Sequence, residues 1–208
     1  MKLHYHPRSP NSIPVLAVAH HLGIHLDLQE VNLLAGDQRK PDFLRLNPNG
    51  KVPTLEDGDF RLWESNAIMQ YIASKKPNNS LWPQDERVRA DISRWQFWRM
   101  GDWGKATATL VWENLIKKWV TGGDPDPEEV KRGEELFHGV ATILNGHLQS
   151  RNYLVGSEVT LADFSVAAFM VYAEPCRFPL DRYNQIRSWY ARIEKLDAWQ
   201  KTAPPRIS

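Results

Sequence analysis

The sequence contains very little cysteine and no long apolar segment. Cys176 is the single cysteine among 208 residues, which excludes an internal disulfide framework and points to a reducing compartment such as the cytoplasm. No apolar run approaches the roughly 20 residues that a membrane-spanning helix needs. Residues 1–5 have the pattern of a strand start and not of a signal peptide. We therefore expect a soluble, cytoplasmic protein that does not bind membranes.

An excess of charge of either sign is also missing. The chain has 26 Lys and Arg against 25 Asp and Glu, a formal net charge of +1. A nearly neutral chain has no strong electrostatic attraction to nucleic acid or to an anionic membrane, so neither is expected as a partner. The length suits one or two domains that can bury a substantial core.

The sequence also lacks the residue spacings that are typical of metal-binding sites. Of the seven histidines, His4 and His6 would share one face of a strand, and His21 and His25 are four positions apart. No carboxylate or cysteine near them completes a known metal-binding pattern. We expect structural or surface roles for these histidines and no metal site.

What the sequence does contain is a long motif at residues 47–65, N-P-N-G-K-V-P-T-L-E-D-G-D-F-R-L-W-E-S. Its first half is a loop punctuated by Pro and Gly, and its second half predicts a hairpin that turns at Asp57 and Gly58. Ser65 stands where a serine caps the next helix, expected over residues 66–75. Two interpretations remain open. These are ordinary turn and cap positions, or a backbone edge and a positive helix end that bind an extended peptide with a carboxylate.

This motif closely resembles, without gaps, the glutathione-binding segment of the cytosolic glutathione transferases, and of the phi class in particular. The resemblance implies that Val52 and Pro53 form a cis peptide bond whose backbone pairs with the cysteinyl unit of glutathione. It also implies that Glu64 and Ser65 hold the γ-glutamyl end. Glutathione is therefore the expected co-substrate.

The order of the predicted elements agrees with this resemblance. We expect a strand at residues 3–5, a helix with apolar positions from Val15 to Leu22, a second strand from Leu26 to Leu34, a short helix at residues 42–46, and then the hairpin and helix above. In the glutathione transferases this order forms a thioredoxin-like α/β domain. We expect that N-terminal domain to span residues 1–76.

Residues 77–86 interrupt all periodicity and are predicted to be a linker. Residues 87–208 are expected to form an all-α C-terminal domain that binds the electrophile. Its first helix would run to Trp119, straight or bent near Gly101 and Gly104. Others would begin at Asp126 and at Thr160, and an amphipathic one would carry Ile186 to Leu196. The run after Thr160 resembles the family's C-domain signature, in which the residue matching Asp163 is structural.

The resemblance places the group that activates the thiol near the first helix, where Ser9, Asn11 and Ser12 lie together. A free thiol with a pKa near 8.5 is only a few per cent ionised at pH 7. Lowering that pKa by about two units requires roughly 2.7 kcal/mol. A charge-assisted hydrogen bond and the positive end of a helix can together supply this energy.

Ser9 is the favoured catalytic residue, because its spacing from Tyr5 and Pro7 matches the catalytic serine of the phi, theta and delta classes. The Arg that usually follows in those classes is absent here. Asn11 is an alternative, since its loop resembles the bacterial nu-like class, where an Asn or Thr holds the sulfur. Ser12 is the third candidate and is otherwise explained as a helix cap.

Three further contacts are carried over from the resemblance. Arg39 stands where phi-class chains have a basic residue that faces the glycyl carboxylate of glutathione, although Gln38 replaces the family's neighbouring His. Lys51 is a second cation for the same carboxylate. Trp103 belongs to a tryptophan-rich segment that packs in the core or lines the electrophile pocket.

The sequence therefore predicts a glutathione transferase that conjugates the thiolate to small, largely apolar electrophiles, as in detoxification. A glutathione-dependent peroxidase or disulfide-bond reductase is the alternative, and a non-catalytic binding protein of the same fold is a second one. The family typically forms homodimers, and a homodimer is expected here.

Overall fold

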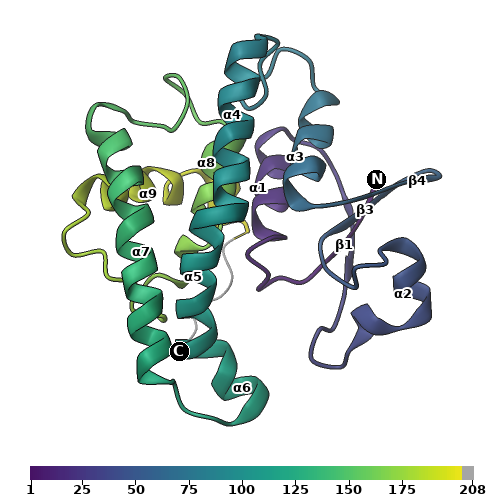
Figure 1. Ribbon diagram of the computed structural model, residues 1–208. Coiled ribbons are helices and arrows are strands. Elements are labelled where there is room, and N and C mark those ends of the chain that lie inside the picture. The colour runs from purple at the N-terminus through teal and green to yellow at the C-terminus, as the bar shows by residue number, and fades with distance from the viewer. Residues whose placement is uncertain (203–208) are drawn as a thin grey trace.

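The computed structural model describes residues 1–202. A mixed four-stranded sheet with its helices forms the first part, and helices alone form the second (Figure 1). This arrangement confirms the predicted thioredoxin-like N-terminal domain and all-α C-terminal domain. Residues 77–85 contain no helix or strand, although the domain boundaries themselves stay a prediction.

The sheet has the strand order β2-β1-β3-β4. Strand β1 (Lys2–Tyr5) pairs in parallel with β2 (Asp27–Glu30) and antiparallel with β3 (Thr54–Asp57), which pairs antiparallel with β4 (Phe60–Trp63). A parallel pair of strands needs a crossover connection, and here a helix connects β1 to β2. The sheet therefore follows the predicted element order.

Two predicted boundaries in the sheet were wrong. The second strand ends at Glu30 and does not reach Leu34, because the Asn32 side chain accepts a hydrogen bond from the Ala35 backbone and turns the chain. In the hairpin, the two loop residues are Gly58 and Asp59, one position later than predicted. The φ of Gly58 is 64°, as a two-residue hairpin loop requires.

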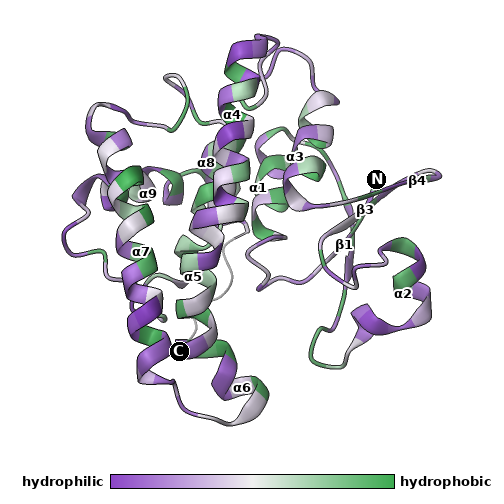
Figure 2. Cartoon of the chain, viewed as in Figure 1, coloured by the Kyte–Doolittle hydropathy of each residue, from purple (hydrophilic) through white to green (hydrophobic). Residues whose placement is uncertain are grey.

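Helices α1 (Ile13–His21) and α3 (Ser65–Ser74) pack against each other and against the helical domain. Residues 13–19 of α1 are all buried, because α8 (Leu161–Ala167) and α10 (Asp197–Gln200) of the second domain cover the side that the sheet leaves free. Figure 2 shows hydrophobic residues along this helix. The short helix α2 (Pro41–Leu46) lies apart from both (Figure 1). Helix α1 therefore lies at the interface between the two domains.

The long helix predicted to follow the linker is a continuous rod with two π-helical turns. It consists of α4 (Glu86–Trp98), a π turn (Arg99–Trp103), α5 (Gly104–Val111), a second π turn (Trp112–Ile116) and α6 (Lys117–Thr121). A π turn holds one extra residue and often occurs at functional sites. At the first turn, the Gly104 backbone N–H donates to the Arg99 carbonyl. A Cβ on Gly104 would lie 2.7 Å from that carbonyl oxygen, so glycine permits the turn.

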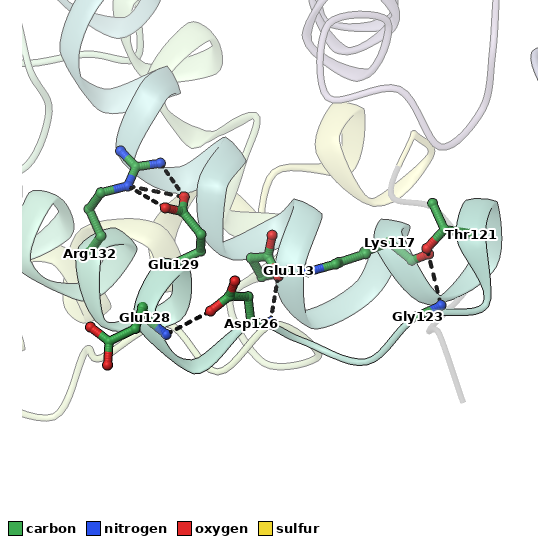
Figure 3. A network of polar contacts seen from close by, with 8 residues as sticks. All are labelled: Glu113, Lys117, Thr121, Gly123, Asp126, Glu128, Glu129 and Arg132. Atoms are coloured by element: carbon green, nitrogen blue, oxygen red, sulfur yellow. Dashed lines mark hydrogen bonds and ion pairs between the residues drawn. The ribbon is translucent and has the colours of Figure 1, made fainter.

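Helix α7 (Pro127–His147) packs against α5 and is followed by a 3-10 turn (Leu148–Ser150). Asp126 caps it as predicted by accepting from the Glu128 backbone. Figure 3 shows how the buried Glu113 links the two helices, since its carboxylate accepts from Lys117 and from the Asp126 backbone, both at 2.8 Å. This network fixes the loop between α6 and α7.

The central helix α8 (Leu161–Ala167) begins with the predicted capping box of Thr160 and Asp163. The Asp163 carboxylate also accepts from the Leu154 backbone and from the Trp189 indole on α9 (Asn184–Glu194), both at 2.9 Å. These contacts agree with the expected structural role of Asp163. The remaining helical elements are the 3-10 turns Asp37–Arg39 and Met170–Tyr172 and helix α10 (Asp197–Gln200). Within residues 1–202, none of the helices combines the length and apolarity needed to cross a membrane.

Candidate active site

The strand register brings the predicted site segments to one end of the sheet. His4 pairs with Thr54, which in turn pairs with Trp63. The loop that follows β1, the segment that precedes β3 and the start of α3 after β4 therefore lie at the same end. Strand β2 ends there too, because Glu30 pairs with Tyr5. Residues far apart in the sequence thus surround one location.

Ser9 lies in the loop that enters α1, and its backbone organises that loop. Its carbonyl accepts from the Ser12 and Ile13 backbones at 2.9 and 3.1 Å, and its Oγ accepts from the Asn11 backbone at 3.3 Å. Ser9 thus satisfies N–H groups that the helix start would leave unpaired. The residue is 8% exposed. Among the described residues its hydroxyl hydrogen has no acceptor, so it is available to a ligand.

The other two thiol-activating candidates are held by protein contacts. Ser12 is fully buried, and its Oγ accepts from the His6 backbone at 3.4 Å instead of capping α1. The expectation that its side chain caps the helix was therefore wrong. Asn11 is partly exposed, and its Oδ1 accepts from the Arg99 guanidinium at 2.6 Å. Among the described residues, the Asn11 amide N–H₂ has no hydrogen-bond partner.

Two residues of the helical domain hold the Ser9 loop, and no sequence pattern indicated either of them. The Arg99 Nη2 donates to the Pro10 carbonyl at 3.4 Å besides Asn11, and the Tyr172 hydroxyl donates to the Arg8 carbonyl. Burial raises the pKa of Tyr172 to about 12, so this hydroxyl stays protonated as a donor. Hydrogen bonds from two side chains of the second domain therefore hold the Ser9 loop in place.

The bond between Val52 and Pro53 is cis, as the resemblance implied. Both residues are buried, and the loop before them is held by Asn47, which is 2% exposed. The Asn47 amide donates to the Lys51 carbonyl at 2.8 Å and to the Thr54 hydroxyl at 3.1 Å. The backbone at Val52 is therefore presented by a fixed loop at the edge of the site.

Glu64 has a φ of 73°, a region that non-glycine residues rarely adopt and that clusters at functional sites. It is the N-cap residue of α3, and Ser65 is the first residue of that helix. The prediction that Ser65 caps α3 was therefore wrong by one position. Ser65 is 4% exposed, and its Oγ has no hydrogen-bond partner among the described residues. Its hydroxyl and the helix N-terminus are both available to a carboxylate.

Arg39 and Lys51 are exposed, and neither forms an ion pair within residues 1–202. Arg39 lies in the turn after β2, and Lys51 precedes the cis bond, so both belong to the site end of the sheet. The expected contact with the glycyl carboxylate stays a prediction.

Trp103 is fully buried and packs against Trp98 and Phe137. Its indole donates to the Val166 carbonyl at 3.1 Å. This placement gives Trp103 a packing role, so we do not assign it to the electrophile pocket. Trp119 is half exposed instead, and the Arg8 guanidinium lies 5.9 Å from its ring. No group of three or more metal-ligating side chains gathers in the part of the chain that the structure describes.

Comparison with known proteins assigns the family. Residues 1–74 match the model of the glutathione S-transferase N-terminal domain, and residues 127–192 match that of the C-terminal domain. Glutathione S-transferase D7 of Drosophila melanogaster is 31% identical over 204 residues, which cover 97% of this chain and 88% of that protein. The chain belongs to the glutathione S-transferase family.

Solved glutathione S-transferases have the same fold. Glutathione transferase F7 from Populus trichocarpa matches with a TM-score of 0.89 and 28% identity over 97% of each chain. The structure of glutathione S-transferase-I bound with the ligand lactoylglutathione matches with a TM-score of 0.88 and 25% identity, again over 97% of each chain. These matches confirm the family that the motif at residues 47–65 resembles.

Proposed function

We propose that this glutathione S-transferase family member conjugates glutathione to small, largely apolar electrophiles, with Ser9 stabilising the thiolate. The observation that carries the proposal is the hydroxyl of Ser9. It is held by the Asn11 backbone, its hydrogen has no acceptor among the described residues, and it lies at the same sheet end as the cis bond and the start of α3. A donor of this kind favours an ionised sulfur.

The proposed ground-state contacts divide the glutathione molecule between segments. The Val52 backbone pairs with the cysteinyl unit, and Glu64 and Ser65 bind the γ-glutamyl end, where the α3 N-terminus favours the carboxylate. Arg39 and Lys51 attract the glycyl carboxylate. Because both cations lack an ion-pair partner within residues 1–202, they are free to pair with the ligand.

In the proposed reaction the thiol loses its proton to solvent and the Ser9 hydroxyl donates to the resulting thiolate. The sulfur attacks an electrophilic carbon and forms a C–S bond. The leaving group departs with its electron pair, or an activated alkene takes up a proton after the addition. Stabilising the thiolate raises its concentration at neutral pH and so raises the rate.

A glutathione-dependent peroxidase or disulfide-bond reductase is the second candidate, and one observation favours it. The Arg99 contact occupies the Asn11 oxygen, so the Asn11 amide N–H₂ remains as a possible donor to the sulfur. A non-catalytic binding protein of this fold is the third candidate. The hydroxyl of Ser9, whose hydrogen has no acceptor among the described residues, argues against it, because binding alone does not need a donor at the thiol.

The proposal includes a homodimer and a cytoplasmic detoxification role. Large apolar side chains are exposed on β4 and along the α4 rod, where Phe97 is 76% exposed and Met100 is 43% exposed. Phe60 and Trp63 on β4 are also exposed. Exposed apolar side chains of this kind mark interaction surfaces, and two-fold symmetric dimers are the commonest oligomers. The buried free thiol of Cys176 suits a reducing compartment.

Turnover with a panel of substrates tests the proposal. Glutathione is supplied with an activated aryl halide, an α,β-unsaturated carbonyl compound, an organic hydroperoxide and a mixed disulfide. We expect turnover of the halide or the unsaturated carbonyl. Turnover of only the hydroperoxide or the disulfide would move the assignment to the second candidate. Calorimetric binding of glutathione without any turnover would move it to the third.

A further inference from the structure

Arg99 is a buried cation that contacts the Ser9 loop and forms no ion pair with any carboxylate in residues 1–202. The residue is 2% exposed. Nη2 donates to the Asn11 Oδ1 at 2.6 Å and to the Pro10 carbonyl at 3.4 Å, and Nη1 lies 2.8 Å from the Met100 sulfur. The Phe169 ring lies 5.1 Å from the guanidinium carbon, and the buried Nε has no partner within residues 1–202.

This environment is costly for folding. A buried charge is destabilising unless it is paired, and here neutral oxygens, a thioether and an aromatic face replace the usual carboxylate. Burial lowers the pKa of Arg99 to about 10, while the charge of Glu64 acts in the opposite direction. The guanidinium is therefore still protonated at neutral pH. A residue that weakens the fold and holds a positive charge beside the Ser9 loop has a functional explanation.

Arg99 lies at the start of an unusual backbone feature, a π turn. Arg99 is the first residue of the π turn that separates α4 from α5, and Gly104 closes that turn by donating to the Arg99 carbonyl. The extra residue of a π turn changes the direction in which the following side chains point. From the end of α4, the Arg99 side chain reaches Pro10 and Asn11, which lie 89 and 88 positions away in the sequence.

We propose that Arg99 is a positioning residue for thiolate formation, which holds the loop beside Ser9 and favours the ionised sulfur of bound glutathione through its positive charge. The inference rests on the proposed function. Its two effects have separate origins. The bonds to Asn11 and Pro10 fix the loop from which the Ser9 hydroxyl donates. The charge acts through space, and because Arg99 is buried, solvent and salt screen it only weakly.

Neutral replacements of Arg99 test the charge. In Arg99→Met, an apolar side chain replaces an unpaired charge among Met100 and Phe169, so we expect an unchanged or higher melting temperature. We also expect the thiol pKa of bound glutathione, followed by thiolate absorbance against pH, to rise by about one unit, the lower end of the effect of a nearby charge. In Arg99→Lys the charge remains, and at least half of the wild-type lowering should persist.

Arg94→Gln is the matched control, because Arg94 lies on α4 just before the π turn but is exposed and paired with Asp91. It should leave the thiol titration unchanged. Arg99→Gln is a second neutral variant and should reproduce the pKa rise of Arg99→Met. Three outcomes would overturn the inference: an unchanged thiol pKa in folded neutral variants, an Arg99→Lys titration as high as that of Arg99→Met, or failure of both neutral variants to fold. If the wild-type protein shows no bound thiol to titrate, the proposed function fails instead.

Discussion

The backbone N–H of Asn11 donates to the Ser9 Oγ at 3.3 Å, so the Ser9 hydroxyl oxygen accepts a hydrogen bond from within its own loop. A hydroxyl that already accepts one hydrogen bond has a fixed position and still has its hydrogen to donate. Ser12, only three positions later, has no exposed surface and faces the His6 backbone. This difference favours Ser9 over Ser12 as the donor to the glutathione sulfur.

Replacing Ser65 with Ala should weaken glutathione binding about tenfold or more. The Ser65 hydroxyl would lose a charge-assisted hydrogen bond to the ligand carboxylate, worth roughly 1.5–3 kcal/mol. Because its Oγ has no partner among the described residues and does not cap α3, the melting temperature should barely change. Calorimetric titration and a melting curve measure the two effects. Ser74→Ala, at the other end of α3, is the control and should bind normally. Normal affinity in Ser65→Ala would remove Ser65 from the binding site.

Asp163→Asn should destabilise the fold by about 3 kcal/mol. The two carboxylate oxygens accept four hydrogen bonds, from the Leu154 and Thr160 backbones, the Thr160 hydroxyl and the Trp189 indole. An amide turns one of these acceptors into a donor and leaves buried N–H groups unpaired. Denaturant unfolding measures the loss, and Asp197→Asn, at an exposed carboxylate, should show none. A stable Asp163→Asn protein that had lost only its activity would contradict the structural role.

Acid should remove the contribution of Glu113 to stability. The hydrogen bond from the Asp126 backbone, followed by that from Lys117, lowers the pKa of Glu113 below its ordinary value of 4.5 (Figure 3). An acid whose pKa is lowered on folding stabilises the protein above its unfolded pKa, and this effect is lost as the pH falls through the folded pKa. We expect Glu113→Gln to melt a few degrees below wild type at pH 7, with the difference shrinking as the pH falls through the lowered pKa of the folded-state Glu113 carboxyl.

The exposed Glu129, which pairs with Arg132 in the same region, is the control for Glu113. Glu129→Gln should follow the wild-type melting curve at every pH, since exposed pairs contribute little. If the melting difference for Glu113→Gln persisted unchanged at pH 3, an effect other than its charge would be responsible.

The element order and the hairpin were predictable because the signals are local. Apolar spacing marks α1, and Asp57 and Gly58 mark a tight turn between short apolar runs. The end of β2 was missed because it depends on one side-chain contact, from Asn32 to the Ala35 backbone. That contact accompanies the end of β2 at Glu30, although apolar residues continue in the sequence as far as Leu34.

The contacts that Arg99 and Tyr172 make with the Ser9 loop were not predictable from the sequence. Arg99 and Asn11 are 88 positions apart, and Tyr172 and Arg8 are 164 apart, so no local pattern connects them. The π turn adds a second difficulty, because its extra residue shifts the helical phase that periodicity arguments use. Trp103 ends this turn and lies in the core. A regular 3.6-residue repeat does not indicate which way it points.

The protein should be a homodimer in solution. Light scattering at micromolar concentration should give twice the 24.0 kDa mass of one chain. Phe97→Asp should shift the mass toward that of one chain, because it places a charge on the most exposed aromatic side chain of the α4 rod. Leu34→Asp is the control at another exposed apolar residue, in the loop after β2, and should leave the dimer intact. A wild-type mass near 24.0 kDa with full activity would contradict the dimer.

Thiolate absorbance against pH, measured on the glutathione complexes of wild type and Ser9→Ala, tests the central role of Ser9 most directly. We expect a bound thiol pKa well below the free value of about 8.5 in the wild type. In Ser9→Ala the pKa should rise by about one to two units while the glutathione dissociation constant changes by less than about threefold, because the hydroxyl acts on the thiolate and not on the peptide. Superimposable titration curves for the two proteins would contradict the account and move thiolate stabilisation to another residue of the loop.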